Sequence, residues 1–205
     1  MGKKTSIYEK TYRNYLSQIG DIDFNSLGEK LQIKTEGSEA QVPLFGKTYN
    51  VSPSGILDPH GKQPPFDICV ILCKYLLLCP DIKPRDNDWV SFRGLKDSGP
   101  LINYFSNDVE KAISSYFSGK LELLKEAARG LGGYVPDIES SYDLCMEFSA
   151  FPMIPVIMLF NDTDDEFPST CSILFERRAE KYLDAECIAI AGRLLFQFLK
   201  SWNRF

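Results

Sequence analysis

Carboxylate side chains are concentrated in one stretch of this chain, residues 161–186. The stretch holds eight acids and three bases, so it carries the whole formal net charge of −5 and leaves the remaining residues neutral overall. Its acids are Asp162, Asp164, Asp165, Glu166, Glu176, Glu180, Asp184 and Glu186, and its bases are Arg177, Arg178 and Lys181. Closely spaced carboxylates can bind a hard cation, contact a partner or form a solvated turn.

The tightest group of acids, residues 162–166, could supply the several oxygen ligands that Mg²⁺ or Ca²⁺ requires. A complete calcium-binding loop would also need a glycine at its bend and a glutamate further along, and neither occurs at that spacing. We therefore favour a turn without bound metal and predict no other cofactor. Asp164, Asp165 and Glu166 remain ligand-binding candidates, because Phe167 and Pro168 indicate that the turn folds back onto the core.

A second candidate site combines Trp89 and Arg93, which flank the apolar residues Val90 and Phe92. An arginine framed by aromatic side chains can present its guanidinium group to an anionic ligand. Alternatively, Arg93 is a core residue paired with a nearby acid, and Trp89 anchors its loop to the core. In that case, replacement of Trp89 with alanine should destabilise the fold by about 3–5 kcal/mol.

The cysteines and the single histidine do not indicate catalysis. Cys69, Cys73 and Cys79 lie in an apolar run without the spacing of iron–sulphur ligands, which predicts reduced, buried thiols. His60 lies in a turn sequence and has no evident nucleophile to activate. No catalytic residue is therefore assigned.

Composition excludes several classes of function. The chain has 205 residues, of which 44% are hydrophobic and 13% aromatic, which is enough to bury a core. A negative net charge argues against a nucleic-acid partner, which requires clustered bases. No apolar run suggests a membrane span or a signal peptide, so we expect a cytoplasmic protein without membrane contact.

The pattern of apolar residues predicts a single α+β domain over residues 1–205, with a mainly antiparallel sheet and helices packed against it. An early helix ending at Gly20 precedes a meander of short strands over residues 31–57. Further helices are expected at residues 68–79, 106–117 and 120–131, strands at 142–149, 153–160 and 172–175, and a last helix capped by Asp184.

Several motifs in the second half of the chain occur in a specific order. They are Trp89-Val90-Ser91-Phe92-Arg93, Pro152 and Pro155, Asp165-Glu166-Phe167-Pro168, Leu174-Phe175, and Tyr182-Leu183 with Glu186. Together they resemble an uncharacterised family of anaerobic bacteria and archaea that is known only as a domain of unknown function. Some members of that family carry an additional cysteine-rich iron–sulphur domain similar to those of corrinoid one-carbon proteins, which this sequence does not contain.

These observations favour a binding or accessory module of unknown ligand, with a protein or a small molecule as its partner. The resemblance implies a link to iron–sulphur or corrinoid one-carbon chemistry on a partner protein. The alternative is a metal-assisted enzyme that uses the carboxylates of residues 162–166 with Arg93 as an anion clamp. An enzyme should gather these groups in one pocket, whereas an accessory module should show them dispersed beside exposed apolar residues.

Overall fold

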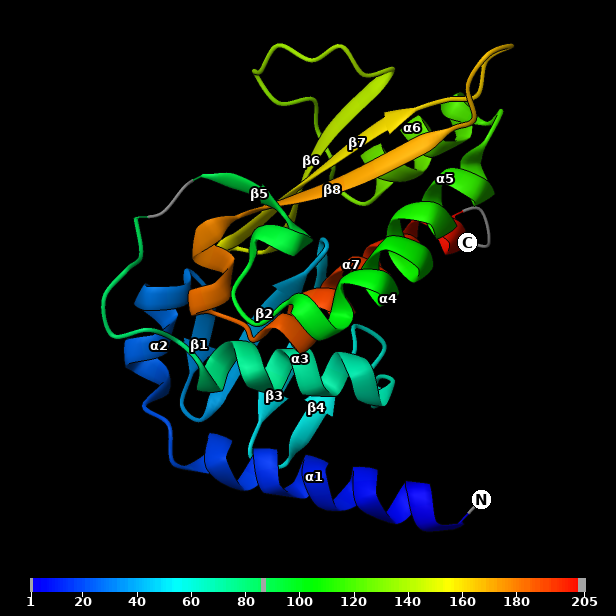
Figure 1. The fold of residues 1–205 in the computed structure, drawn as a ribbon. Helices are drawn as coiled ribbons and strands as arrows, with labels where there is room; N and C mark the ends of the chain where they lie inside the picture. Colours follow the sequence, from blue (N-terminus) through cyan, green and yellow to red (C-terminus); the bar gives the residue numbers. More distant parts are fainter. Residues whose placement is uncertain (1, 86–87, 203–205) are drawn as a thin grey trace.

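Two antiparallel sheets of four strands each organise the fold (Figure 1). The computed structural model describes residues 2–85 and 88–202, with the side chains of the first helix from residue 9 onward. The first sheet has the order β1-β2-β3-β4 and comprises β1 (Lys34–Glu36), β2 (Glu39–Leu44), β3 (Lys47–Ser52) and β4 (Gly55–Leu57). The second has the order β5-β8-β7-β6 and comprises β5 (Trp89–Ser91), β6 (Leu144–Phe151), β7 (Ile154–Asn161) and β8 (Thr170–Glu176).

The helices lie around and between these sheets (Figure 1). They are α1 (Gly2–Gly20), α2 (Phe24–Leu31), α3 (Phe66–Leu77), α4 (Ile102–Phe105), α5 (Lys111–Phe117), α6 (Leu121–Gly130) and α7 (Ala185–Ser201). A π-helical turn, Ser106–Glu110, joins α4 to α5, and short 3₁₀ turns occur at Phe92–Gly94, Gly99–Leu101 and Arg177–Lys181. None of the helices in the described residues is both long enough and apolar enough to cross a bilayer.

The two sheets meet at the tight turn between β2 and β3. Phe45 and Gly46 both adopt positive φ there, which lets a short connection follow the twist of the paired strands. The Phe45 amide donates a hydrogen bond to the Ala150 carbonyl of β6 (3.1 Å), and its ring packs edge-on against Phe198 of α7. The turn therefore fastens the first sheet to both the second sheet and the last helix.

The core is continuous across the whole domain. Its centre includes α3. The ring of Tyr75 in this helix stacks on Phe151 of β6 (4.1 Å between centroids), and the Tyr75 hydroxyl accepts a hydrogen bond from the Met153 amide (3.3 Å). Helix α3 also packs against both α1 and α7. The predicted α+β fold with antiparallel sheets is confirmed.

Several local predictions differ from the structure. The helix expected to start at residue 106 begins at Ile102, because α4 runs through the π-helical turn into α5. Helix α2 and strand β5 were not predicted. Helix α2 has only eight residues and contains Gly28, although its buried Phe24, Leu27 and Leu31 follow helical spacing. Strand β5 has only three residues, too few to give a periodic pattern.

Candidate functional site

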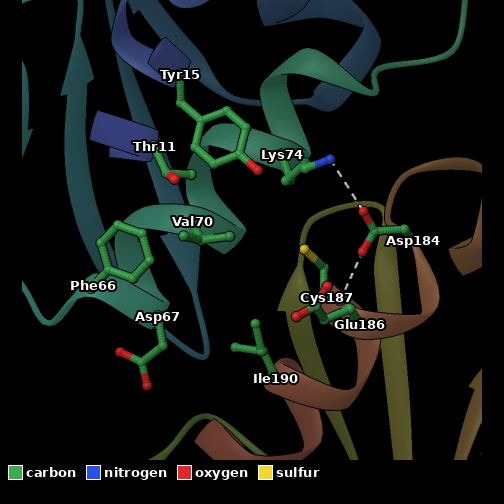
Figure 2. A pocket seen from close by; sticks show the side chains of 10 residues that line it. All are labelled: Thr11, Tyr15, Phe66, Asp67, Val70, Lys74, Asp184, Glu186, Cys187 and Ile190. Atoms are coloured by element: carbon green, nitrogen blue, oxygen red, sulfur yellow. Dashed lines mark hydrogen bonds and ion pairs between the residues drawn. The ribbon is translucent and has the colours of Figure 1, made fainter. Parts of the chain in front are cut away.

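A cleft of about 640 Å³ opens between α1, α3 and α7 (Figure 2). Small-molecule sites in proteins typically measure about 300–1,000 Å³ and combine apolar walls with a few converging polar groups. The lining residues are Thr11 and Tyr15 of α1, Phe66, Asp67, Val70 and Lys74 of α3, and Asp184, Glu186, Cys187 and Ile190 at the start of α7.

Helical spacing explains why these side chains converge. Asp67, Val70 and Lys74 are separated by three and four residues, which places them on one face of α3, while Ile68, Cys69, Ile71, Leu72 and Cys73 are buried in the core. Cys187 and Ile190 are likewise neighbours on one face of α7. The cleft is therefore the side that these core helices leave partly open to solvent.

An ion pair crosses one end of the cleft (Figure 2). Lys74 Nζ lies 3.3 Å from Asp184 Oδ2, and Asp184 Oδ1 caps α7 by accepting a hydrogen bond from the Cys187 amide (2.9 Å). Partial burial favours the neutral form of each group, but the mutual ion pair overrides it and raises the pKa of Lys74. The pKa of Asp184 is lowered, against the effect of burial, by its hydrogen bonds to Cys187 and Lys74. Both groups are therefore charged at neutral pH.

A second ion pair joins the same two helices. Arg193 of α7 donates a hydrogen bond to Asp67 Oδ2 (2.7 Å), and both side chains are less than one-third exposed, at 29% and 23%. Because Asp67 and Lys74 lie at opposite ends of α3, the two pairs fix α3 against α7 at two points. The walls of the cleft are consequently held in place before any ligand binds.

Glu186 and Cys187 differ in what they offer a ligand. Glu186 lies in the first turn of α7, is exposed, and has no ion-pair partner among the described side chains, those of residues 9–85 and 88–202. Cys187 is buried, and burial, together with the adjacent Asp184 carboxylate, raises the pKa of its thiol far above the usual range. The thiol is therefore neutral at physiological pH and poorly suited to nucleophilic attack.

The sequence predictions did not identify this cleft. Lys74 is the polar exception in the apolar helix predicted at residues 68–79, and Asp184 was predicted as a helix cap, which is confirmed. Both residues carried a signal, since a lone lysine in an apolar helix needs a partner or an opening to solvent. Their pairing could not be predicted, because it depends on the contact between α3 and α7.

The acidic turn between β7 and β8 is stabilised by its own backbone. Asp164 Oδ1 accepts hydrogen bonds from the amides of Phe167 (2.7 Å) and Glu166 (2.8 Å), and these bonds lower the pKa of Asp164. Asp165 and Glu166 are exposed. The expectation that Phe167 folds the turn back onto the core is wrong, because Phe167 is 66% exposed. Among the described residues, no three acids, cysteines or histidines are grouped to hold a metal ion.

The remaining acids of residues 161–186 have separate roles. Asp162 Oδ1 accepts hydrogen bonds from the amides of Gly119 (2.6 Å) and Thr163 (2.8 Å), which ties the turn to the end of α5. Glu176 forms an ion pair with Arg178, and its carboxylate is largely buried. Asp184 lies at the cleft. The stretch is thus one charge run in sequence but several unrelated sites in space.

Trp89 and Arg93 lie near the other end of the second sheet. Trp89 is half-buried in β5 opposite Glu176, whereas Phe92 is only 3% exposed and stacks on Phe105 of α4 (4.3 Å between centroids). The segment is therefore anchored mainly by Phe92. Arg93 is exposed and pairs with no acid in the described part of the chain, so it is not a core arginine. It borders a small cavity of about 120 Å³ beside Glu110.

The structure does not bring the predicted candidates together. Strand β5, which leads to Arg93, pairs with the end of β8 at Leu174–Glu176, whereas the acidic turn precedes the beginning of β8 (Figure 1). Neither Arg93 nor Asp164, Asp165 and Glu166 lines the cleft. The Asp162 amide donates a hydrogen bond to Asp143 (2.8 Å), which joins the acidic turn to the start of β6.

The cysteines and the histidine match most of their predictions. All six cysteines are free thiols, and Cys69 and Cys73 are buried in α3, where burial raises the pKa of each thiol, to about 11 and about 12 respectively. Cys79 lies beyond the end of α3 and is only half-buried, so its predicted burial is only partly correct. His60 is exposed in a turn whose Asp58 carboxylate accepts a hydrogen bond from its amide.

Comparison with known proteins identifies the family. No curated protein matches the chain, and neither does any solved structure. One family does match, and its match includes the cleft residues of α3 and α7 as well as both sheets. Residues 23–198 match the domain of unknown function DUF3786, and the chain therefore belongs to this uncharacterised family.

Proposed function

We propose that this chain is a cytoplasmic binding module and that its ligand, a small organic molecule, occupies the cleft between α1, α3 and α7. The observation that carries the proposal is the cleft itself. Its volume of about 640 Å³ suits a small molecule, and ionisable side chains from two helices converge on apolar walls there. The two ion pairs between α3 and α7 hold those walls, which reduces the cost of ordering the site on binding.

The alternative function, a metal-assisted enzyme, is less well supported by the geometry. It would need the carboxylates of residues 162–166 in one pocket with Arg93, but these groups flank opposite ends of β8. Asp162 and Asp164 also already accept backbone hydrogen bonds. The thiol that faces the cleft, Cys187, is a poor nucleophile because of its raised pKa. The geometry therefore favours a binding module over a metal-assisted enzyme.

A protein partner is a further part of the proposal. Exposed Val135, Ile138 and Phe167 lie on segments rich in carboxylates, a combination that suits a partner surface with apolar and basic side chains.

The resemblance supports a partner that carries an iron–sulphur cluster or a corrinoid. Purification of the chain with its partner without oxygen, followed by metal analysis, tests this link. Iron or cobalt in the partner supports the link, and a partner free of both contradicts it.

The cleft proposal is tested by filling the cleft from two different elements. Val70→Trp from α3 and Thr11→Trp from α1 would each place an indole in the opening, whereas Asn14→Trp adds the same group to an exposed position of α1 outside the lining. A library of small organic fragments is screened against all four proteins by ligand-detected NMR. We expect fragments that bind the parent and Asn14→Trp but neither filled variant. Fragments that bind all four proteins equally would contradict the proposal.

A further inference from the structure

We infer that the cleft selects a ligand with an organic cation, such as a primary ammonium group, attached to an apolar body. This inference rests on the proposed binding function of the cleft. It follows from the way in which the charges of the lining residues are already paired. Glu186 is the position where the ligand's cationic group would bind, and Phe66, Val70 and Ile190 would contact its apolar part.

The described lining residues include three carboxylates and one lysine, but most of this charge is internally neutralised. Asp67 is paired with Arg193 (2.7 Å), and Asp184 is paired with Lys74 (3.3 Å). When both pairs are set aside, the charge that remains among the described lining residues belongs to Glu186, which is exposed and has no ion-pair partner among the side chains that the structure describes. The residual charge that the described lining residues present to a ligand is therefore negative.

An anionic ligand would meet a structural cost that a cation avoids. Lys74, the lysine among the described lining residues, is already paired with Asp184, so an anion beside it would be repelled by that carboxylate. The same carboxylate caps α7 through the Cys187 amide, so it could not move away from the anion without weakening the helix start. An ammonium group can pair with Glu186 while both interhelical ion pairs stay intact.

The apolar walls of the cleft are the reason why the proposed ligand has an apolar part. Phe66, Val70 and Ile190 are half-buried, so they present hydrophobic surface that is neither in the core nor fully in water. Burial of that surface against a ligand would contribute about 25 cal/mol per Å² of apolar area. The Tyr15 ring already contacts a cation, because Lys74 Nζ lies 5.7 Å from its centroid.

Three probes that share one phenylethyl body test the charge preference: phenethylamine, phenethyl alcohol and hydrocinnamate. Their binding is measured by isothermal titration calorimetry at neutral pH. The variants are Glu186→Gln and, as a matched control, Glu126→Gln, which removes one exposed carboxylate from α6, far from the cleft lining. We expect phenethylamine to bind most tightly, hydrocinnamate least tightly, and Glu186→Gln to weaken only the amine, by about tenfold.

The possible results separate the ligand class from the site. Tighter binding of hydrocinnamate than of phenethylamine, or an equal loss of amine affinity in both variants, would overturn the cationic ligand. If binding of the preferred probe is still abolished by both Val70→Trp and Thr11→Trp, the proposed function stands without that class. Failure of all three probes to bind the parent, or binding that survives in both filled variants, would overturn both.

Discussion

Lys74 of α3 and Asp184 at the start of α7 form an ion pair across one end of the cleft, with 3.3 Å between Nζ and Oδ2. The same Asp184 carboxylate accepts the Cys187 amide hydrogen bond that caps α7. One side chain therefore fixes the helix start, neutralises the lysine of the cleft and joins two core helices. Changes at this pair should be measurable in stability as well as in binding.

Lys74→Met should lower the free energy of unfolding by about 1 kcal/mol, because it removes the partner of Asp184 at a site that is only partly exposed. Lys125→Met is the control. Lys125 pairs with Glu122 within one helix (2.7 Å), and such pairs contribute only about 0.2–0.5 kcal/mol. Chemical denaturation of both variants measures the difference. An equal loss of unfolding free energy in the two variants would show that the pair between α3 and α7 stabilises the fold no more than a pair within one helix.

The stability difference between the parent and Lys74→Met should depend on pH in a defined direction. The pKa of Asp184 is lowered in the folded protein, so its contribution is present above the unfolded value of about 3.9 and is lost as pH falls through the folded pKa. We therefore expect the full difference near neutral pH and a shrinking difference below about pH 4. Denaturation curves of both proteins, recorded from neutral pH to below about pH 4, test the expectation. A stability difference that stays constant in acid would contradict it.

Phe92→Ala should destabilise the fold more than Trp89→Ala. Phe92 is buried and stacked on Phe105, so its removal leaves a cavity that costs about 3–5 kcal/mol. Trp89 is half-buried on a short edge strand, so we now expect its removal to cost about 1–2 kcal/mol, less than its sequence context suggests. Thermal and chemical unfolding compare the two variants. A larger loss in Trp89→Ala would restore Trp89 as the principal anchor.

Millimolar Mg²⁺ or Ca²⁺ should leave the melting temperature unchanged. Asp162 and Asp164 already accept backbone hydrogen bonds, and the neighbouring Asp165 and Glu166 are exposed to water, so the turn is stable without a cation. Differential scanning calorimetry with and without the metal checks this. A clear rise that disappears when Asp164 and Asp165 are both changed to Asn would instead establish a cation site and favour the enzyme hypothesis.

The sequence predicted the fold well wherever apolar periodicity was strong. The meander of the first sheet, the three long strands of the second and the helix capped by Asp184 lie close to their expected positions. The π-helical turn at Ser106–Glu110 was not predicted, because its residues have the same apolar spacing as a regular helix. Strand β5 forms because β8 offers it a free edge, which no local pattern reveals.

The candidate site could be predicted only in fragments. The sequence marks Lys74 and Asp184 individually, but they are far apart along the chain and meet only through the packing of α3 against α7. The acidic turn, by contrast, is easy to notice in the sequence but lies outside the lining of the cleft. Its charges are adjacent in the chain, yet Asp164 is occupied by local backbone hydrogen bonds, and Arg93 borders a separate cavity beside Glu110.

Methyl NMR of the parent protein during titration with phenethylamine, phenethyl alcohol and hydrocinnamate tests the central claim, ligand binding in the cleft, most directly. Val70 and Ile190 report from two walls of the cleft, Val156 reports from the core of the second sheet, and Val135 reports from an exposed loop. We predict saturable shifts of the Val70 and Ile190 methyl resonances with at least one probe, while Val156 and Val135 stay unchanged. Shifts confined to Val135, or no saturable shift at Val70 and Ile190 with any probe, would contradict the claim.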